Sequence, residues 1–175
     1  EECSSIISMS TRLENPKTWE NAYSLISNAW KLEEENLECL QQLCYWREIQ
    51  ARKRNKPKTW VAKDKDLLNI ALIIGDANSI STQMLMNADE IDQRFIRRDG
   101  DEILEKLKNS RYKLPPVNKQ LLTYPLSLSS RKILQSCQKR VVELADKLSI
   151  SPELLARKRI LQRLVRDYEH HGYLF

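Results

Sequence analysis

Glycine is scarce in this sequence, with 3 among 175 residues, where average usage of about 7% would give roughly a dozen. Because glycine supplies the backbone conformations of tight turns and hairpins, its scarcity argues against a β-rich fold. Long apolar runs are also missing: none approaches the ~18 residues of a membrane-spanning helix. The opening Glu1-Glu2-Cys3 does not resemble a basic, apolar signal peptide. We therefore expect an all-α protein located in the cytoplasm.

Metal-ligand patterns are absent as well. The cysteines form no C-x-x-C pair and have no histidines nearby at zinc-ligand spacing. We therefore expect no metal site and no cofactor in this chain, and we expect the cysteines to be buried free thiols. These cysteines are Cys3, Cys39, Cys44 and Cys137.

Positive charge is in excess. The sequence carries 29 Lys and Arg against 24 Asp and Glu, a net charge of +5, with a pI of about 9.0. Hydrophobic residues at 41% and charged residues at 30% are typical of a folded soluble chain. A basic surface attracts polyanions where its charges cluster, so the positions of the cations indicate function.

Apolar residues at spacings of three and four predict helices along the first half of the chain. The first two are predicted over residues 18–35 and 36–55. Asp64 is expected to cap a third helix that Gly75 closes. A capping-box pattern at residues 87–90 is expected to begin the last helix of this half.

A proline-containing segment then separates two groups of helices. Pro115, Pro116 and Pro125 lie between helical patterns, so Tyr112 to Pro125 is predicted to be a linker with at most one short helical turn. An apolar stripe predicts a long helix over residues 134–148. Ser151-Pro152 is expected to begin a last helix whose apolar face is Leu161, Leu164, Val165 and Tyr168.

The sequence also repeats itself. Pairing Leu40 with Leu134, an offset of 94 residues, also pairs Ala51 with Ala145 and superposes the apolar faces of the third and last helices. We therefore predict a duplicated unit of helix, extended connection and helix. The word ARKR occurs at residues 51–54 and 156–159, at positions that this register does not align. The second copy ends opposite Ser81 and is expected to lack the helices that follow in the first.

Particular residues carry a resemblance to a known module. LECLQQLCYWREIQARKRNKPKTWVAKDKDLLNIA, at residues 37–71, resembles the first helix, linker and second helix of an HRDC domain, the module shared by helicases and the C-terminal part of ribonuclease D. The pattern WRE-x-x-ARKRN-K-P-x-x-WV-x-KD is closer to the ribonuclease D version. ISPELLARKRILQRLV, at residues 150–165, is similar to the second HRDC-like unit of that family.

The resemblance implies tandem small helical HRDC-like bundles, the second incomplete. EEC at the start and AWKL at residues 29–32 resemble the segment that joins the family's nuclease domain to its first HRDC domain. Residues 1–35 are then a connecting segment and helix that follow a nuclease domain absent from this sequence. Residues 36–111 form the first HRDC domain, residues 112–126 the linker, and residues 127–175 a second, partial HRDC-like domain.

The resemblance also implies an activity for a longer parent protein. The family are 3′–5′ exoribonucleases that trim RNA ends, including those of tRNA precursors, with four acidic residues that hold two divalent metal ions, expected to be Mg²⁺, in the nuclease domain. Those motifs do not occur in this sequence, so no catalytic residue is carried over. Acidic residues such as Asp89 and Asp92 lie at predicted caps and solvent faces, whereas paired metals need carboxylates that converge. We expect this chain to position RNA without catalysing its cleavage.

The cations gather in two clusters. No acidic residue lies between Arg52 and Lys63, so the charges of this stretch would repel one another, and phosphates would relieve that repulsion while releasing counterions. Cations near a helix end also complement the helix dipole while they stay solvated, and both interpretations stay open. The first cluster consists of Arg52, Lys53, Arg54, Lys56, Lys58, Lys63 and Lys65.

The second cluster belongs to the last predicted helix, opposite its apolar face. These cations would either follow a phosphate backbone or form a solvated helix face. Trp60, beside the first cluster, is a candidate for base stacking, although a tryptophan in a helix connection more often packs into the core, as we also expect for Trp46. The second cluster consists of Arg157, Lys158, Arg159, Arg163 and Arg166.

Two other functions compete with RNA binding. The first is binding of single-stranded DNA, as in a helicase HRDC domain, which a preference for DNA over tRNA would reveal. The second is a structural or protein-interaction module whose helices pack against the nuclease domain. Charge reversal in the first cluster that leaves RNA affinity unchanged would favour this second alternative.

Overall fold

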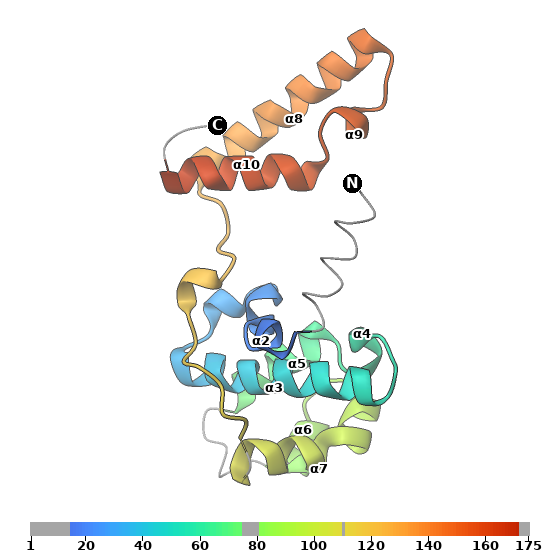
Figure 1. Ribbon diagram of the computed structural model, residues 1–175, viewed down its shortest axis with the longest axis vertical. Coiled ribbons are helices and arrows are strands. Elements are labelled where there is room, and N and C mark those ends of the chain that lie inside the picture. The colour runs from blue at the N-terminus through green and yellow to red at the C-terminus, as the bar shows by residue number, and fades with distance from the viewer. Residues whose placement is uncertain (1–14, 75–80, 110, 172–175) are drawn as a thin grey trace. The chain divides into compact units, whose positions relative to one another are not determined.

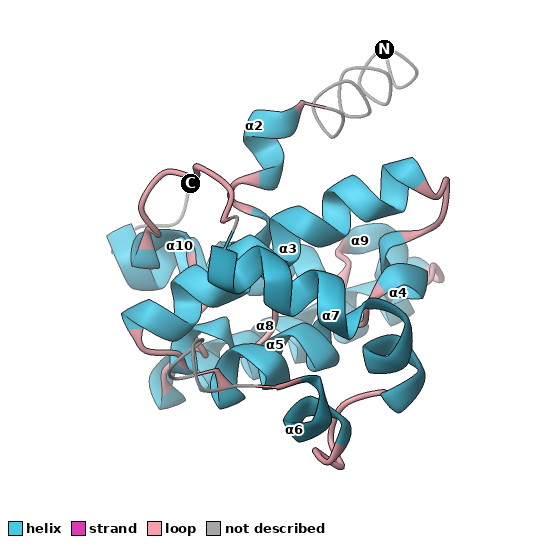
Figure 2. Cartoon of the chain, turned by 90° about the horizontal axis from the view of Figure 1, so that it is seen from below, coloured by secondary structure: helices cyan, strands magenta, loops and turns pink. Residues whose placement is uncertain are grey.

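The computed structural model describes residues 15–74, 81–109 and 111–171. These residues form helices and loops and contain no β-strand (Figure 2), which confirms the all-α prediction. The chain divides into two compact units, residues 1–123 and 124–175, which are described separately.

The first unit is built on one long central helix. Helix α3 (Glu34–Lys53) packs against α5 (Asp64–Ile73) and α7 (Gln93–Asn109), and the short helix α4 (Lys58–Val61) lies in the connection between α3 and α5 (Figure 1). Helix α6 (Thr82–Met86) packs on α7, where the lack of a side chain at Gly100 admits the Thr82 methyl group. The core includes Leu37, Leu40, Leu43, Trp46, Leu67, Ile70, Ile96 and Ile103, all with at most 1% of their surface exposed.

The segment before α3 is broken into short turns, so the helix predicted over residues 18–35 is wrong. It consists of α2 (Pro16–Trp19) and the 3₁₀ turns η1 (Ala22–Leu25) and η2 (Ala29–Lys31). Asparagine and serine side chains compete for backbone hydrogen bonds and disfavour helix interiors: the Ser24 hydroxyl donates to the Asn21 carbonyl at 2.8 Å, and Asn28 adopts a left-handed conformation. The apolar positions still face inward, because Ala22, Tyr23, Ile26 and Ala29 are buried.

The proline-containing segment is held against the first unit. Its only described helical turn is η3 (Lys119–Leu121), as predicted. The buried Tyr23 hydroxyl accepts from the Asn118 backbone N–H at 2.7 Å, and the Gln41 amide donates to the Glu20 and Pro115 carbonyls, both at 3.1 Å. The segment that precedes α3 in the sequence and the proline-containing segment that follows α7 are therefore hydrogen-bonded to each other, and both are hydrogen-bonded to α3 through Gln41.

Two predicted helix caps in the first unit are wrong. Lys63 is the N-cap of α5 and makes no side-chain cap, whereas Asp64 lies in the first turn and accepts from the Arg47 guanidinium at 2.6 Å. The pattern at residues 87–90 forms a turn before α7; Asp92 caps instead, because its carboxylate accepts from the Arg94 N–H at 3.0 Å. Gly75, the predicted end of the third helix, lies outside the described residues.

The second unit contains α8 (Leu128–Leu148), α9 (Pro152–Leu155) and α10 (Lys158–His171). Helices α8 and α10 pack against each other, with Ala145, Leu161 and Val165 buried. The Ser127 N–H, at the start of α8, donates to Glu169 near the end of α10 at 3.1 Å, so the two helices run antiparallel.

The predicted repeat is present in the backbone. With the offset of 94, the bounds of α4 coincide with those of α9, and α5 begins opposite the start of α10. Each long helix ends in a left-handed residue, Asn55 with φ 47° and Ser149 with φ 55°. The Lys56 N–H donates to the Ala51 carbonyl at 2.9 Å. At the equivalent positions, the Ile150 N–H donates to the Ala145 carbonyl at 3.0 Å.

The same equivalence explains why the predicted last helix is divided. Ala62 and Ala156 both adopt an extended conformation that ends the short helix before the next begins. The helix begun at Ser151-Pro152 is therefore α9 alone, and the apolar face of Leu161 and Val165 belongs to α10. The described residues of the second unit include no counterpart of α6 or α7.

Candidate nucleic-acid interface

The first basic cluster surrounds the C-terminal end of α3 and the connection to α5. Arg52 and Lys53 end the helix, Arg54 is its C-cap, and the left-handed Asn55 turns the chain towards α4. The remaining cations flank or lie in α4 and α5. Most of these side chains are at the surface, with Arg52 and Arg54 half-buried.

Arg54 forms an ion pair with the buried Asp99. Its guanidinium donates to both carboxylate oxygens of Asp99, at 2.7 and 3.2 Å, and Arg98 donates to the same carboxylate at 2.8 Å. Burial by itself would raise the pKa of Asp99, but the hydrogen bonds from Arg54 and Arg98 hold it below its usual value. The hydrogen bond to Asp99 in turn raises the pKa of Arg54. This pair joins the end of α3 to α7.

Three more cations of the cluster have acidic partners. Glu48 accepts from Arg52 at 2.8 Å and from Lys58 at 3.3 Å. Lys63 lies 3.1 Å from Asp92, and the hydrogen bond between them raises the pKa of Lys63 and lowers that of Asp92.

The assumption that this cluster is uncompensated is therefore wrong for four of its seven members. The stretch contains no acid between Arg52 and Lys63, but the fold supplies Glu48 from the preceding turn of α3, and Asp92 and Asp99 from the region of α7. The three that remain, Lys53, Lys56 and Lys65, are exposed and have no ion pair within 4.0 Å among the described residues. These three lysines are the part of the cluster best suited to phosphates.

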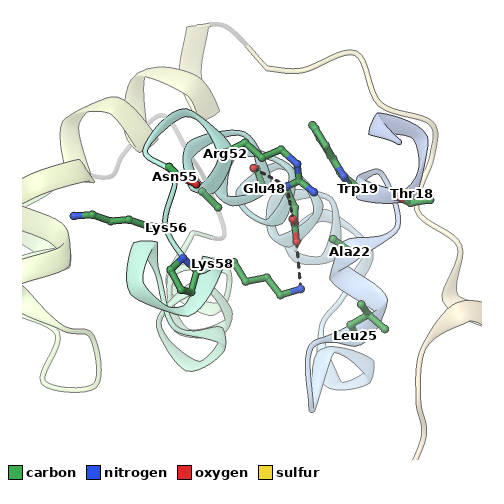
Figure 3. A pocket seen from close by; sticks show the side chains of 11 residues that line it. Thr18, Trp19, Ala22, Leu25, Glu48, Arg52, Asn55, Lys56 and Lys58 are labelled. Carbon is green, nitrogen blue, oxygen red and sulfur yellow. Dashed lines mark hydrogen bonds and ion pairs between the residues drawn. The ribbon is translucent and has the colours of Figure 1, made fainter. Parts of the chain in front are cut away.

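A cavity of about 570 Å³ adjoins this cluster. Trp19 and Leu25 line it on the side of the N-terminal segment, and Glu48 and Arg52 on the side of α3. Figure 3 shows Glu48 between Arg52 and Lys58, with Trp19 beside the Arg52 guanidinium. The guanidinium carbon lies 3.9 Å from the centroid of the Trp19 ring, a cation–π distance.

The two candidate tryptophans differ in burial. Trp46 is 1% exposed and donates from its indole nitrogen to Glu102 at 3.1 Å, so its predicted place in the core is confirmed. Trp60 is 71% exposed, so the interpretation that it packs into the core is wrong. Helix α4 is a single turn, and Val61 and Ala62 supply its buried contacts. An exposed indole beside cations suits base stacking.

The second cluster is at the surface of the second unit. Arg157, Lys158 and Arg159 are exposed at the start of α10, and Arg163 is exposed further along it, 3.9 Å from Asp167. Arg166 is half-buried. No acidic residue lies in the first turn of α10. The cations at this end of the helix are therefore repelled by the positive end of the helix dipole.

The two clusters share two equivalent positions in the repeat. Lys63 and Lys65 correspond to Arg157 and Arg159, and the exposed Trp60 corresponds to Leu154, which is 78% exposed. Both units therefore present a large apolar side chain on the short helix and two cations around the start of the next helix. The offset of 94 in the sequence aligned these positions, but the sequence alone could not show that Trp60 and Leu154 are both exposed.

Catalytic chemistry has few candidates in the described part of the chain. Cys39 and Cys44 are buried, as predicted, and burial raises the pKa of each thiol to about 12; Cys137 is half-buried, and Cys3 lies outside the described residues. No group of three or more His, Cys, Asp or Glu is placed to hold a metal ion within the described ranges. None of the described helices is long and apolar enough to cross a membrane.

Comparison with known proteins agrees with this arrangement of helices. The family model of the HRDC domain matches residues 36–107, which contain the first basic cluster and most of α3 and α7. These residues therefore resemble an HRDC domain. The matched range begins near the start of α3, and the segment containing Trp19 and Leu25 precedes it.

Over a longer range the chain is similar to the C-terminal HRDC region of ribonuclease D. It is 30% identical to ribonuclease D of Pseudomonas paraeruginosa over 152 residues, which cover 86% of this chain and 39% of that protein. It is 27% identical over 147 residues to the Escherichia coli K12 enzyme. The chain spans about two fifths of the length of these relatives.

A solved structure supports the same relationship. The crystal structure of Escherichia coli RNase D, described as an exoribonuclease involved in structured RNA processing, matches with a TM-score of 0.61 at 27% identity. The match covers 86% of this chain and 39% of that one. The similarity therefore extends beyond the HRDC domain.

Proposed function

We propose that this chain is the RNA-binding region of a ribonuclease D-like 3′–5′ exoribonuclease that acts on structured RNA, with tRNA precursors as the expected substrates. The chain holds the RNA, and cleavage belongs to a separate nuclease domain of the same polypeptide, where Mg²⁺ is expected. The observation that carries this proposal is a set of exposed lysines, Lys53, Lys56 and Lys65, that have no ion pair among the described residues. They lie on an HRDC domain similar to that of ribonuclease D.

The exposed tryptophan adds a second kind of contact. Trp60 lies between Lys58 and Lys63 and is largely exposed, and sequence-tolerant binding of single strands combines cations with aromatic stacking. Phosphate contacts of this kind make affinity fall steeply with salt concentration. The second cluster, with Arg157 and Arg159 at positions equivalent to Lys63 and Lys65, is proposed to make phosphate contacts of the same kind from the second unit.

The test is charge reversal of the three lysines. The triple variant Lys53→Glu, Lys56→Glu and Lys65→Glu is expected to weaken binding to precursor tRNA and to reduce the salt slope by about one for each lost phosphate contact. Lys31→Glu is the control for the reversal of one lysine at a distant site, because Lys31 lies just before the start of α3. The basic cluster lies at the other end of this helix of 20 residues, which is about 30 Å long. Fluorescence anisotropy across a salt series measures both quantities.

Two outcomes would favour the competing functions. RNA affinity that is the same in the triple variant and in Lys31→Glu would favour a structural or protein-interaction module. Binding of single-stranded DNA at the same site with higher affinity than precursor tRNA would favour a helicase-like DNA-binding module.

A further inference from the structure

The cavity beside the first cluster is not a product of the HRDC domain alone. Trp19 and Leu25 form one wall and lie before residue 36, where the family match begins. The opposite wall comes from the end of α3 and the connection to α4, including Arg52 and Lys58. The site therefore exists only where the preceding segment packs on the domain.

The cavity has the size of a small-ligand site. Its volume of about 570 Å³ lies within the range of about 300–1,000 Å³ that is typical of such sites. The segment that closes it is fixed in place, because Tyr23 is fully buried and hydrogen-bonds to Asn118.

The two walls meet at a flat, stacked surface. The Arg52 guanidinium lies over the Trp19 ring at 3.9 Å, and Trp19 in turn contacts Tyr45, with ring centroids 6.2 Å apart. Unstacked bases of single-stranded RNA pack against aromatic rings and against the planes of arginine guanidinium groups. The place where Trp19 meets Arg52 combines both kinds of surface.

Polar groups in the cavity suit the rest of a nucleotide. Glu48, whose side chain is 10% exposed, is bonded by Arg52 and Lys58, so a carboxylate acceptor lies between two cationic donors (Figure 3). Counting Lys56, three cations and one acid line the cavity, an excess of positive charge that favours a phosphate. The Lys56 side chain points away from Glu48 (Figure 3).

We propose that this cavity receives one unstacked nucleotide of the bound RNA, with its base against the stack of Trp19 and Arg52 and its phosphate near Lys58. This inference rests on the proposed function and adds a base-dependent contact to the general attraction of the lysines. Electrostatic binding alone would not distinguish an intact nucleotide from one that lacks its base.

The experiment measures the affinity of the chain for a short single-stranded RNA and for a series of variants of that RNA, each of which lacks the base at one position. Two variants keep the net charge: Trp19→Leu keeps an apolar side chain but removes the ring, and Arg52→Lys keeps the charge but removes the planar group. One abasic position is expected to weaken binding to the parent chain about fivefold or more, since a stacked base contributes about 1–3 kcal/mol. Both variants should bind the intact RNA as weakly as the parent binds that abasic RNA.

The controls separate the possible failures. Thermal melting of each variant by circular dichroism checks that the fold is kept, and Arg52→Lys, at a side chain 29% exposed, serves if Trp19→Leu does not fold. An RNA whose affinity is unaffected by any abasic position would overturn the nucleotide site and leave RNA binding intact. If the loss of affinity at an abasic position disappears in Trp60→Ala and persists in Trp19→Leu, the base contact belongs to Trp60 on α4 instead. No binding of RNA by the parent chain at low salt would overturn the proposed function itself.

Discussion

Replacing Asp99 by asparagine tests the ion pair that joins α3 to α7. The Asp99 side chain is 1% exposed and accepts hydrogen bonds from Arg54 and Arg98, whose side chains are 27% and 48% exposed. A hydrogen bond to a charged group contributes about 1.5–3 kcal/mol, and the exposure of the two arginines reduces their share through solvent screening. We expect Asp99→Asn to lower the free energy of unfolding at pH 7 by about 2–3 kcal/mol, well below the upper range for a fully buried pair.

The effect should depend on pH in a defined direction. The pKa of Asp99 is lowered in the folded state, so its contribution to stability is fully present above the unfolded-state pKa, about 3.9. That contribution is lost as the pH falls through the folded-state pKa. The difference between the parent and Asp99→Asn should therefore be constant from pH 7 to pH 5 and should narrow below about pH 4.

Tryptophan fluorescence during urea unfolding measures this effect in the first unit alone, because all 4 tryptophans precede residue 124. Glu105→Gln is the control, since Glu105 is an exposed acid on the same helix and should change stability by less than about 0.5 kcal/mol. An Asp99→Asn variant as stable as Glu105→Gln, or a difference that grows as the pH falls, would refute the role assigned to the pair.

Three further predictions concern burial and backbone conformation. Cys39 and Cys44, with pKa values of about 12, should react with a thiol reagent at neutral pH only after unfolding; rapid labelling of either of these two cysteines in the native chain, identified by peptide mapping, would contradict their burial. Trp60→Ala should change the free energy of unfolding by less than about 0.5 kcal/mol, whereas Trp46→Ala should lower it by about 3–5 kcal/mol, and equal effects in urea unfolding would contradict the difference in exposure. Ser149→Gly should raise the melting temperature of the second unit, because glycine adopts a positive φ without strain, a gain of up to about 1 kcal/mol; a lower melting temperature would argue against the left-handed conformation.

The repeat shows how far sequence patterns predict this fold. The offset of 94 that pairs Leu40 with Leu134 also aligns the helix ends, the left-handed residues and the extended alanines of the two units. Apolar spacing predicted α3, α5, α7 and α8 because each has one face in a core. The same spacing failed over residues 18–35, where the apolar side chains are buried but asparagine and serine divide the backbone into turns.

The candidate site was harder to predict because its electrostatics are set by tertiary contacts. Arg54 and Asp99 are 45 positions apart, so the sequence near Arg54 gives no sign that its charge is paired. Trp19 lies in the range predicted to be the first helix, and nothing local indicates that it stacks on Arg52. The exposure of Trp60 likewise depends on how one helical turn sits on the core.

The measurement that tests the central claim most directly is fluorescence anisotropy of this chain with labelled precursor tRNA and with single-stranded DNA, each over a salt series, with the RNA recovered afterwards to check its length. The proposed function predicts binding to precursor tRNA that weakens steeply with salt, a preference for it over DNA, and RNA of unchanged length. Absence of RNA binding at low salt, or shortening of the recovered RNA, would contradict the assignment of this chain as a non-catalytic RNA-binding region.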